Sequence, residues 1–143
     1  MITLWAGGNQ KLTINRLSLE SAQRNVIGAH IKKDILMAWT VVFLNEAVMA
    51  ELSEQPADIR ARFERIVNLI KEVGLEQVRE PHVKHLDGPL WEMRMTGIDS
   101  IARAIYVKAE GQRLVVVRVF TKKQQKTPKR ELDLALKRAE DIL

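Results

Sequence analysis

Hydrophobic and polar positions follow a helical period most clearly in the middle of the chain. Apolar residues recur there at spacings of four, three, four and three, and they are Ile59, Phe63, Ile66, Ile70 and Val73. This repeat predicts a helix with one apolar stripe. Pro56 is suited to start the helix, and Gly74 is suited to end it.

Strand-like patterns flank this helix. The run Trp39–Leu44 is rich in aromatic and β-branched residues, and Asn45 can cap a short helix that runs from there toward Leu52. Three more β-rich runs, each preceded by turn residues, are Leu90–Thr96, Ile101–Val107 and Arg113–Phe120. Their spacing predicts an antiparallel meander.

A closing helix is expected after Thr127, which can cap it, with Pro128 at its first helical position. Its apolar face consists of Leu132, Leu136 and Ala139. The predicted order is β-α-α-β-β-β-α. We therefore expect an α+β fold, in which two N-terminal helices pack on one face of a small antiparallel sheet and a C-terminal helix completes the domain.

The first thirty-six residues have no strong periodic pattern, although residues 26–35 are a weak helix candidate. Met37 stands immediately before the first predicted strand and can be the biological start. We therefore expect residues 37–143 to form the domain and residues 1–36 to be a leader or extension upstream of it. A docking arm for a partner, or an added strand or helix, is the alternative.

The composition is that of one globular domain, with 29% charged and 46% hydrophobic residues among 143. Cysteine is absent, which excludes disulfides, thiolate metal sites and cysteine nucleophiles. No apolar run approaches the ~18 residues that span a bilayer, and no signal peptide is recognisable, so we expect a cytoplasmic protein without a membrane partner. The net charge of +5, concentrated between Lys84 and Arg130, indicates an acidic partner such as nucleic acid.

The connector between the last strand and the closing helix is the most basic part of the chain. Its cations are Lys122, Lys123, Lys126, Lys129 and Arg130. Like charges this close repel one another unless an anion lies among them, and phosphate of nucleic acid is the usual anion. A solvated loop is the alternative interpretation.

Three stretches in this order carry a family resemblance. They are Pro81 to Leu86, Gly88 to Arg94, and Phe120 to Lys123 followed by Lys126-Thr127-Pro128. With these stretches, residues 37–143 resemble the phage-derived branch of the RelE/HigB-like toxins, which belong to the RelE/ParE superfamily of type II toxin–antitoxin systems. The element order of that family agrees with the order predicted above.

The resemblance implies a microbial-ribonuclease-like fold and an mRNA interferase that cuts messenger RNA in the ribosomal A site. It also implies inhibition by a cognate antitoxin protein. The implied reaction needs no metal or other cofactor, because the ribose 2′-oxygen attacks the adjacent phosphate and expels the 5′-oxygen. Such a reaction needs a base, cations that stabilise the charged phosphorane, and an acid for the leaving oxygen.

Two arginines lie inside otherwise apolar strands and are candidates for charge stabilisation. Arg94 and Arg103 can each hold two phosphate oxygens with a planar guanidinium. Arg103 also lies where the family carries a catalytic arginine, in an Arg-x-x-Tyr setting that Tyr106 completes. The alternative for Arg94 is an ion pair with Glu92 on the same strand face. Tyr106 falls on the opposite face and is expected in the core.

Lys122 and Lys123 are the candidates for phosphate contact and proton transfer, since a lysine crowded by other cations has a lowered pKa. The further candidates for RNA binding are Lys84, Arg118, Lys126, Lys129 and Arg130. Arg118 can instead cap a sheet edge.

The general base is not identified by the sequence. His82 and His85 are spaced three apart in an extended segment, which favours a surface or strand-edge position over catalysis. No histidine or tyrosine follows Tyr106, whereas several relatives carry one near the C-terminus. No metal site is expected. The other functions in play are a toxin of the same fold that inhibits DNA gyrase and a non-catalytic nucleic-acid-binding module.

Overall fold

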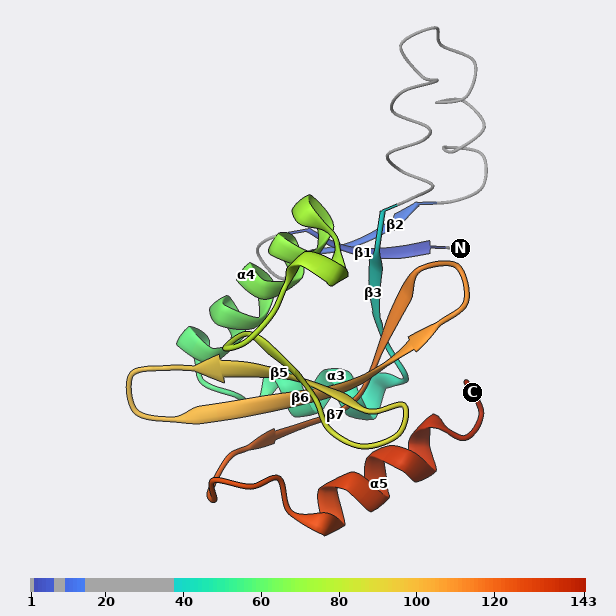
Figure 1. Ribbon diagram of the computed structural model, residues 1–143. Helices are drawn as coiled ribbons and strands as arrows, with labels where there is room; N and C mark the ends of the chain where they lie inside the picture. Colours follow the sequence, from blue (N-terminus) through green and yellow to red (C-terminus); the bar gives the residue numbers. More distant parts are fainter. Residues whose placement is uncertain (1, 7–9, 15–37) are drawn as a thin grey trace, which may run out of the picture.

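A computed structural model describes residues 2–6, 10–14 and 38–143 of the protein (Figure 1). Its strands are β1 (Ile2–Ala6), β2 (Gln10–Ile14), β3 (Thr40–Phe43), β4 (Val83–His85), β5 (Trp91–Thr96), β6 (Ile101–Ala109) and β7 (Arg113–Thr121). Its helices are α3 (Glu46–Ser53), α4 (Ala57–Val73), the short 3-10 helix η1 (Leu75–Gln77) and α5 (Lys129–Ala139). The α+β class and the predicted order of elements are confirmed.

The main sheet has five strands in the order β3-β7-β6-β5-β4. Strands β5, β6 and β7 form the predicted antiparallel meander. The expectation of a purely antiparallel sheet is wrong, because β3 pairs with β7 in parallel. Helices α3 and α4 lie between β3 and the meander in sequence, and this crossover permits parallel pairing. The fifth strand, β4, was not predicted, because a three-residue edge strand leaves too short a pattern.

The two faces of the sheet are covered by different helices (Figure 1), and the two N-terminal helices share one face, as expected. One core joins α3 and α4 to residues such as Met93, Ala104 and Val116. The other core joins α5 to residues such as Ile105 and Val117 on the opposite face. We call the second face the α5 face.

The helix boundaries follow the predicted caps at the start and end of the α3–α4 region. The side chain of Asn45 accepts a hydrogen bond from the Val48 N–H, at 3.1 Å, and Gly74 ends α4 with a positive φ of 86°. The predicted stripe is wrong at one position, because Val73 is 47% exposed. Val73 lies in the last turn of α4, and Val67 is buried instead.

The start of α5 differs from the prediction by one residue. Pro128, not Thr127, is the N-cap residue, and no side chain caps the helix. Thr127 is buried and uses its hydroxyl group elsewhere, as described below.

Part of the N-terminal segment, for which an added strand was one of the alternatives, forms a hairpin. Strands β1 and β2 pair antiparallel, and β1 lies beside β3 (Figure 1). The weak helix candidate at residues 26–35 lies outside the described residues. Among the residues that the structure describes, no helix is long and apolar enough to cross a membrane.

Candidate functional site

Strand register brings the two candidate arginines together on the α5 face. Arg94 of β5 lies directly opposite Arg103 of β6, and Arg103 lies opposite Phe120 of β7. Like charges directly opposite each other destabilise a sheet. The arrangement therefore requires a carboxylate nearby.

Glu92 supplies that carboxylate and is fully buried. Its Oε1 accepts a hydrogen bond from Arg94 Nε at 2.9 Å, and its Oε2 accepts one from Arg103 Nη1 at 3.0 Å. The hydroxyl group of Thr127 donates to the same Oε2, also at 3.0 Å. A charged group in such a place is stable only when its partners satisfy it.

Arg103 connects this carboxylate to the basic connector. Only 3% of the residue is exposed. Besides Glu92, its guanidinium donates to the hydroxyl oxygen of Thr127 and, at 2.9 Å, to the backbone carbonyl of Gln125. These bonds hold the connector against the sheet. The structure thus places Arg103 beneath the site, where its terminal nitrogens are occupied by protein atoms.

Lys122 is partly exposed and lines the same cleft as Arg103. Its backbone N–H donates to the carbonyl of Ile101 at 2.7 Å, which fixes the start of the connector beside β6. Partial burial lowers the pKa of its side chain, and the positive charges of Arg103 and Arg94 lower it further, while Glu92 acts in the opposite direction. The pKa of Lys122 is therefore lowered first by burial, and the crowding by other cations that the sequence suggested acts in the same direction.

A β-bulge determines which β7 side chains share this face. Ile105 pairs with Arg118 whereas Tyr106 pairs with Val116, so Val117 is the extra residue. The extra residue shifts the alternation of side chains along β7 by one position, so Arg118 and Phe120 lie on the same face as Arg103. Bulges re-aim side chains in this way next to functional sites.

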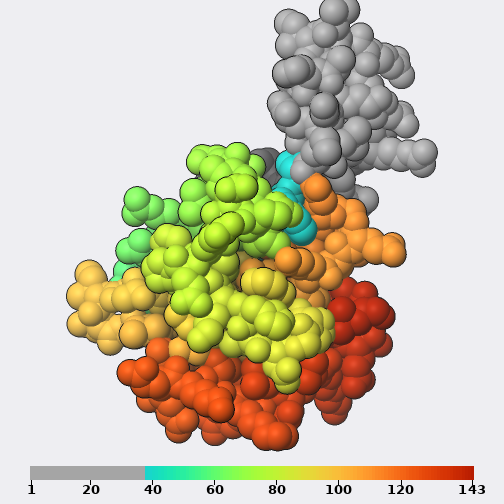
Figure 2. All heavy atoms as spheres, in the orientation of Figure 1, coloured from blue at the N-terminus to red at the C-terminus, as the bar shows by residue number. Residues whose placement is uncertain are grey.

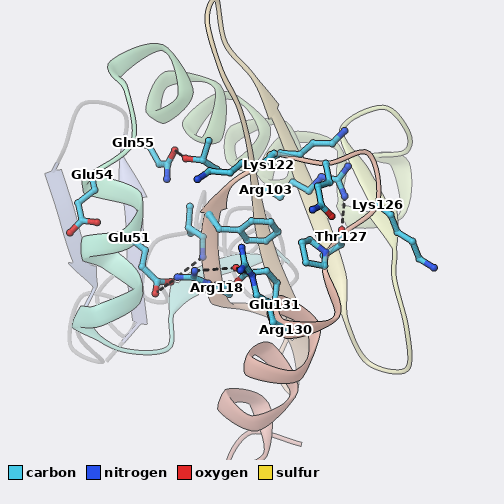
Figure 3. Close-up of a pocket in the computed structure, with 16 residues that line it drawn as sticks. Glu51, Glu54, Gln55, Arg103, Arg118, Lys122, Lys126, Thr127, Arg130 and Glu131 are labelled. Carbon is cyan, nitrogen blue, oxygen red and sulfur yellow. Dashed lines mark hydrogen bonds and ion pairs between the residues drawn. The ribbon is translucent and has the colours of Figure 1, made fainter.

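A cleft of about 380 Å³ opens between α3, the end of β7 and the connector (Figure 3). Its basic lining residues are Arg103, Arg118, Lys122, Lys123, Lys126 and Arg130. Three carboxylates, those of Glu51, Glu54 and Glu131, also line it. The cleft is therefore mixed in charge, and its most basic side is the connector.

Arg118 is neutralised by two of these carboxylates and lies between them in Figure 3. It contacts Glu51 and Glu131 at 2.7 Å each. Glu51 also accepts bonds from Arg138 and from the Val119 N–H. Burial alone would raise the pKa of Glu51, but these hydrogen bonds and the charge of Arg118 lower it. Arg118 thus links α3, β7 and α5 through its two ion pairs.

The remaining predicted RNA-binding residues lie on the surface. Lys84 of β4 is exposed and lies opposite Glu92 in register, and Lys126 is exposed at the cleft. Lys129 forms an i,i+4 pair with Asp133 at 2.8 Å. Arg130 is also exposed, and its Nε lies 3.7 Å from Glu131.

Tyr106 and the histidines lie away from this cluster. Tyr106 is fully buried in the α3–α4 core, as expected, and burial raises its pKa further above neutrality. His85 lies on the same face as Tyr106, because both residues flank Trp91 in the pairing register. His85 is exposed at the sheet edge, and its ring contacts Trp91. His82 lines a hollow beside α4.

Glu92, Thr127 and Glu51 were not predicted from the sequence as residues of the site. A signal for Glu92 was available, because the short turn between Thr96 and Ile101 aligns Arg94 with Arg103 and Glu92 is the carboxylate on that face. No comparable signal exists for Thr127 or Glu51, whose partners are far away in sequence. Among the described residues, no three histidine, aspartate or glutamate side chains are grouped so as to hold a metal ion.

Comparisons with known proteins agree with this fold. The model of the family described as phage-derived protein Gp49-like matches residues 50–140. A solved structure of a mutant of the E. coli toxin RelE in the free state is similar, with a TM-score of 0.52 and 17% identity over 71% of this chain and 98% of that chain. No curated protein sequence matches the chain.

The fold is that of a RelE-like toxin. The family match covers more than half of the chain, so the chain belongs to the phage-derived Gp49-like family, which is a family of RelE-like toxins. The family resemblance found in the sequence is confirmed.

Proposed function

We propose that this protein is the toxin of a type II toxin–antitoxin pair and an endoribonuclease that cuts messenger RNA in the ribosomal A site. We also propose that the protein is cytoplasmic and that a cognate antitoxin inhibits it. The observation that carries it is the placement of two cations around the buried Arg103. Arg94 lies opposite Arg103 in register, and Lys122 begins the connector that Arg103 holds through the Gln125 carbonyl.

Arg94 is suited to bind the scissile phosphate. Its side chain is 27% exposed, and Glu92 engages only its Nε. Within the described part of the chain, no hydrogen bond is formed by its two terminal nitrogens. They are therefore available to bind two oxygens of one phosphate in the plane of the guanidinium. Donors of this kind stabilise the charge that builds up on a phosphorane.

Lys122 is the group that we assign to proton transfer. Its lowered pKa brings it closer to neutrality, which favours general acid–base work. Neutral Lys122 would take the proton from the ribose 2′-OH, whose oxygen then bonds to phosphorus while the bond to the 5′-oxygen breaks. The leaving 5′-oxygen takes up a proton from solvent water. Lys123, which is exposed beside the cleft, adds a phosphate contact.

Arg103 has a positioning role in this proposal. Its bonds to Glu92, Thr127 and the Gln125 carbonyl set the path of the connector and thereby the location of Lys122. Direct contact with RNA is assigned to the exposed cations Lys84, Lys126, Lys129 and Arg130. Arg118 is left out, because two carboxylates neutralise it.

The test is mRNA cleavage by the purified protein, on programmed ribosomes and on the same mRNA without ribosomes, in buffer containing a chelator. We expect cleavage that depends on ribosomes, persists in chelator and leaves a 2′,3′-cyclic phosphate. Intact mRNA combined with inhibited DNA gyrase supercoiling would instead support the gyrase alternative. Binding of RNA without cleavage would support the non-catalytic module.

We also propose that residues 37–143 are the toxin domain, because this segment contains both cores and the whole site. The expected outcome is that residues 37–143 fold and inhibit growth when expressed alone. Insolubility of this segment beside a folded full chain would make β1, which lies next to β3, and its partner strand β2 part of the domain.

A further inference from the structure

A second pocket lies apart from the cleft, between η1 and the strands β4, β5 and β6. Its volume is about 310 Å³, and none of its lining residues also lines the cleft between α3 and the connector. The chain around η1 and β4, coloured yellow-green, faces the viewer in Figure 2. A pocket of this size is suited to one small molecule.

Tyr106 gives this pocket a polar group at its inner end. The residue lines the pocket and is fully buried. Its hydroxyl group has no hydrogen-bond partner among the residues that the structure describes. A buried tyrosine hydroxyl usually has a partner, because an unpaired polar group in the interior costs free energy. The Tyr106 hydroxyl can therefore donate a hydrogen bond to an acceptor atom that enters the pocket.

The wall of the pocket is apolar and aromatic. Strand register places His85 opposite Trp91 and Trp91 opposite Tyr106, so three rings follow one another across β4, β5 and β6. The rings of His85 and Trp91 form a T-shaped contact with 4.8 Å between their centroids, and His85 Nε2 lies 2.9 Å from the carbonyl oxygen of Gly88. The aliphatic residues of the wall are Leu75, Val78 and Val83. A wall of this kind favours a ligand with a flat apolar ring.

Exposed cations lie at the mouth of the pocket. The Nζ of Lys108 is 4.5 Å from the centroid of the Trp91 ring, and Lys108 is exposed. Neither Lys108 nor the exposed Arg79 forms an ion pair with a residue that the structure describes. The basic lining residues Arg79, Lys84 and Lys108 outnumber the carboxylates of Glu76 and Glu80. A negatively charged group of a ligand is therefore attracted to the mouth.

We propose that this pocket binds a single nucleotide. Its base lies against Trp91 and accepts a hydrogen bond from the Tyr106 hydroxyl, and its phosphate pairs with Lys108. A nucleobase combines a flat face with carbonyl oxygens or ring nitrogens at its edge, and the attached phosphate supplies the negative charge. The nucleotide is either free in solution or part of an RNA strand, since both present the same chemistry to the pocket.

The test is titration of the full chain with AMP, GMP, CMP and UMP in a calorimeter. We expect at least one of them to bind with a dissociation constant of roughly 1 mM or lower. Tyr106→Phe keeps the ring and removes only the hydroxyl group, so it should weaken binding by roughly three- to tenfold, as expected for one hydrogen bond. Lys108→Ala should also weaken binding and make it less sensitive to salt. Lys137→Ala, at an exposed residue of α5, is the matched control and should bind normally.

Further titrations show which part of the ligand is recognised and where. The nucleoside without phosphate, and ribose 5-phosphate without a base, should each bind more weakly than the nucleotide. Lys122→Ala with Lys123→Ala should bind the nucleotide as the wild type does, because these lysines line the cleft and not the pocket. Equal binding of ribose 5-phosphate, or loss of binding in this double variant, would overturn the inference.

Thermal unfolding without nucleotide separates a ligand-binding hydroxyl from a structural one. Because the Tyr106 hydroxyl is buried and unpaired, Tyr106→Phe should be at least as stable as the wild type. A melting temperature well below that of the wild type would mean that the hydroxyl is bonded within the fold, through ordered water for example, and would overturn the inference. Failure of all four nucleotides to bind, or equal affinity of Tyr106→Phe and the wild type, would overturn it too.

A short single-stranded RNA with 2′-O-methyl riboses, which lacks the attacking hydroxyl, distinguishes the two sources of the nucleotide. Tighter binding of this RNA than of the mononucleotide, with the gain lost in Tyr106→Phe, would support a nucleotide within an RNA strand. A mononucleotide that binds at least as tightly as the RNA would support a free nucleotide. Either result is independent of mRNA cleavage, so a protein that cuts no mRNA can still bind a nucleotide here.

Discussion

Buried Arg103 and the connector lysines are all positively charged, but they differ in burial and in partners. Arg103 is enclosed by Glu92, Thr127 and a backbone carbonyl. Lys122 is partly open and is crowded by positive charge, and Lys123 is exposed. The difference shows which cations are committed to the fold and which remain available to an anion.

This difference predicts opposite effects of substitution. A buried ion pair that loses one partner leaves an uncompensated charge, and stability falls. Exposed lysines contribute little to folding, because solvent screens their interactions. Substitutions in the buried network should therefore reduce stability, whereas substitutions of the connector lysines should reduce cleavage and leave stability nearly unchanged.

The largest effect is expected for the double change Lys122→Ala with Lys123→Ala. Cleavage on programmed ribosomes should fall by roughly 10²–10⁴-fold, as expected for loss of a proton-transfer group, and growth inhibition should be abolished. The melting temperature should stay close to that of the wild type. Lys137→Ala, at an exposed position of α5, is the control for loss of surface charge. A large drop in melting temperature would give the two lysines a structural role.

The second largest effect is on stability and is expected for a change in the buried network. Glu92→Ala should reduce the free energy of unfolding by about 3–5 kcal/mol, because it leaves Arg103 charged and unpaired in the interior. Urea denaturation of Glu92→Ala beside Glu76→Ala, at an exposed acidic residue, measures the effect. Equal stability of the two variants would mean that the Glu92 network contributes little to the fold.

The third change tests the positioning role of Arg103. Lysine keeps the charge but cannot reach Glu92, Thr127 and the Gln125 carbonyl with one planar group. Arg103→Lys should therefore be nearly as damaging as Arg103→Ala, with cleavage reduced by ~10²-fold at matched folded concentration, as expected for a misplaced catalytic group. Displacement of the connector should also return the pKa of Lys122 toward its ordinary value, which a shift of the pH–rate profile to higher pH would report. Full activity of the lysine variant would reject the positioning role and would mean that Arg103 contributes only its positive charge, which attracts RNA.

The sequence predicted the helices, the meander and the cations of the connector, because these depend on periodicity and local composition. It did not predict the β-bulge at Val117, which determines the face that Arg118 and Phe120 occupy. One extra residue in a strand leaves no trace in the hydrophobic pattern. The parallel pairing of β3 with β7 was missed for a related reason, since it depends on where the helical crossover returns the chain.

The same limit applies to the site. Residue type alone predicted positive charge at Arg94, Arg103 and Lys122, but it did not separate the buried arginine from the open lysine. That separation depends on Thr127 and Gln125, which reach Arg103 only when the connector folds back over the sheet. Contacts between residues so distant in sequence are set by tertiary structure.

The smallest expected effect concerns the second buried network and its response to acid. Hydrogen bonds from Arg138, the Val119 N–H and Arg118 outweigh the effect of burial and lower the pKa of Glu51 from 4.5. As the pH falls below 4.5, the unfolded chain takes up this proton before the folded protein does, so stability is lost. Above that pH the contribution of Glu51 is fully present.

Glu51→Gln removes this dependence. We expect it to lower the free energy of unfolding at neutral pH by about 1.5–3 kcal/mol, the range for hydrogen bonds to a charged group. It should also reduce the loss of stability in acid. Denaturant titrations at pH 7 and at pH values below 4.5 measure both quantities. Glu54→Gln, at an exposed residue of the same cleft, is the control. An acid dependence identical in the wild type and Glu51→Gln would show that Arg118 is held by Glu131 alone and would leave it more available to an anion than the structure indicates.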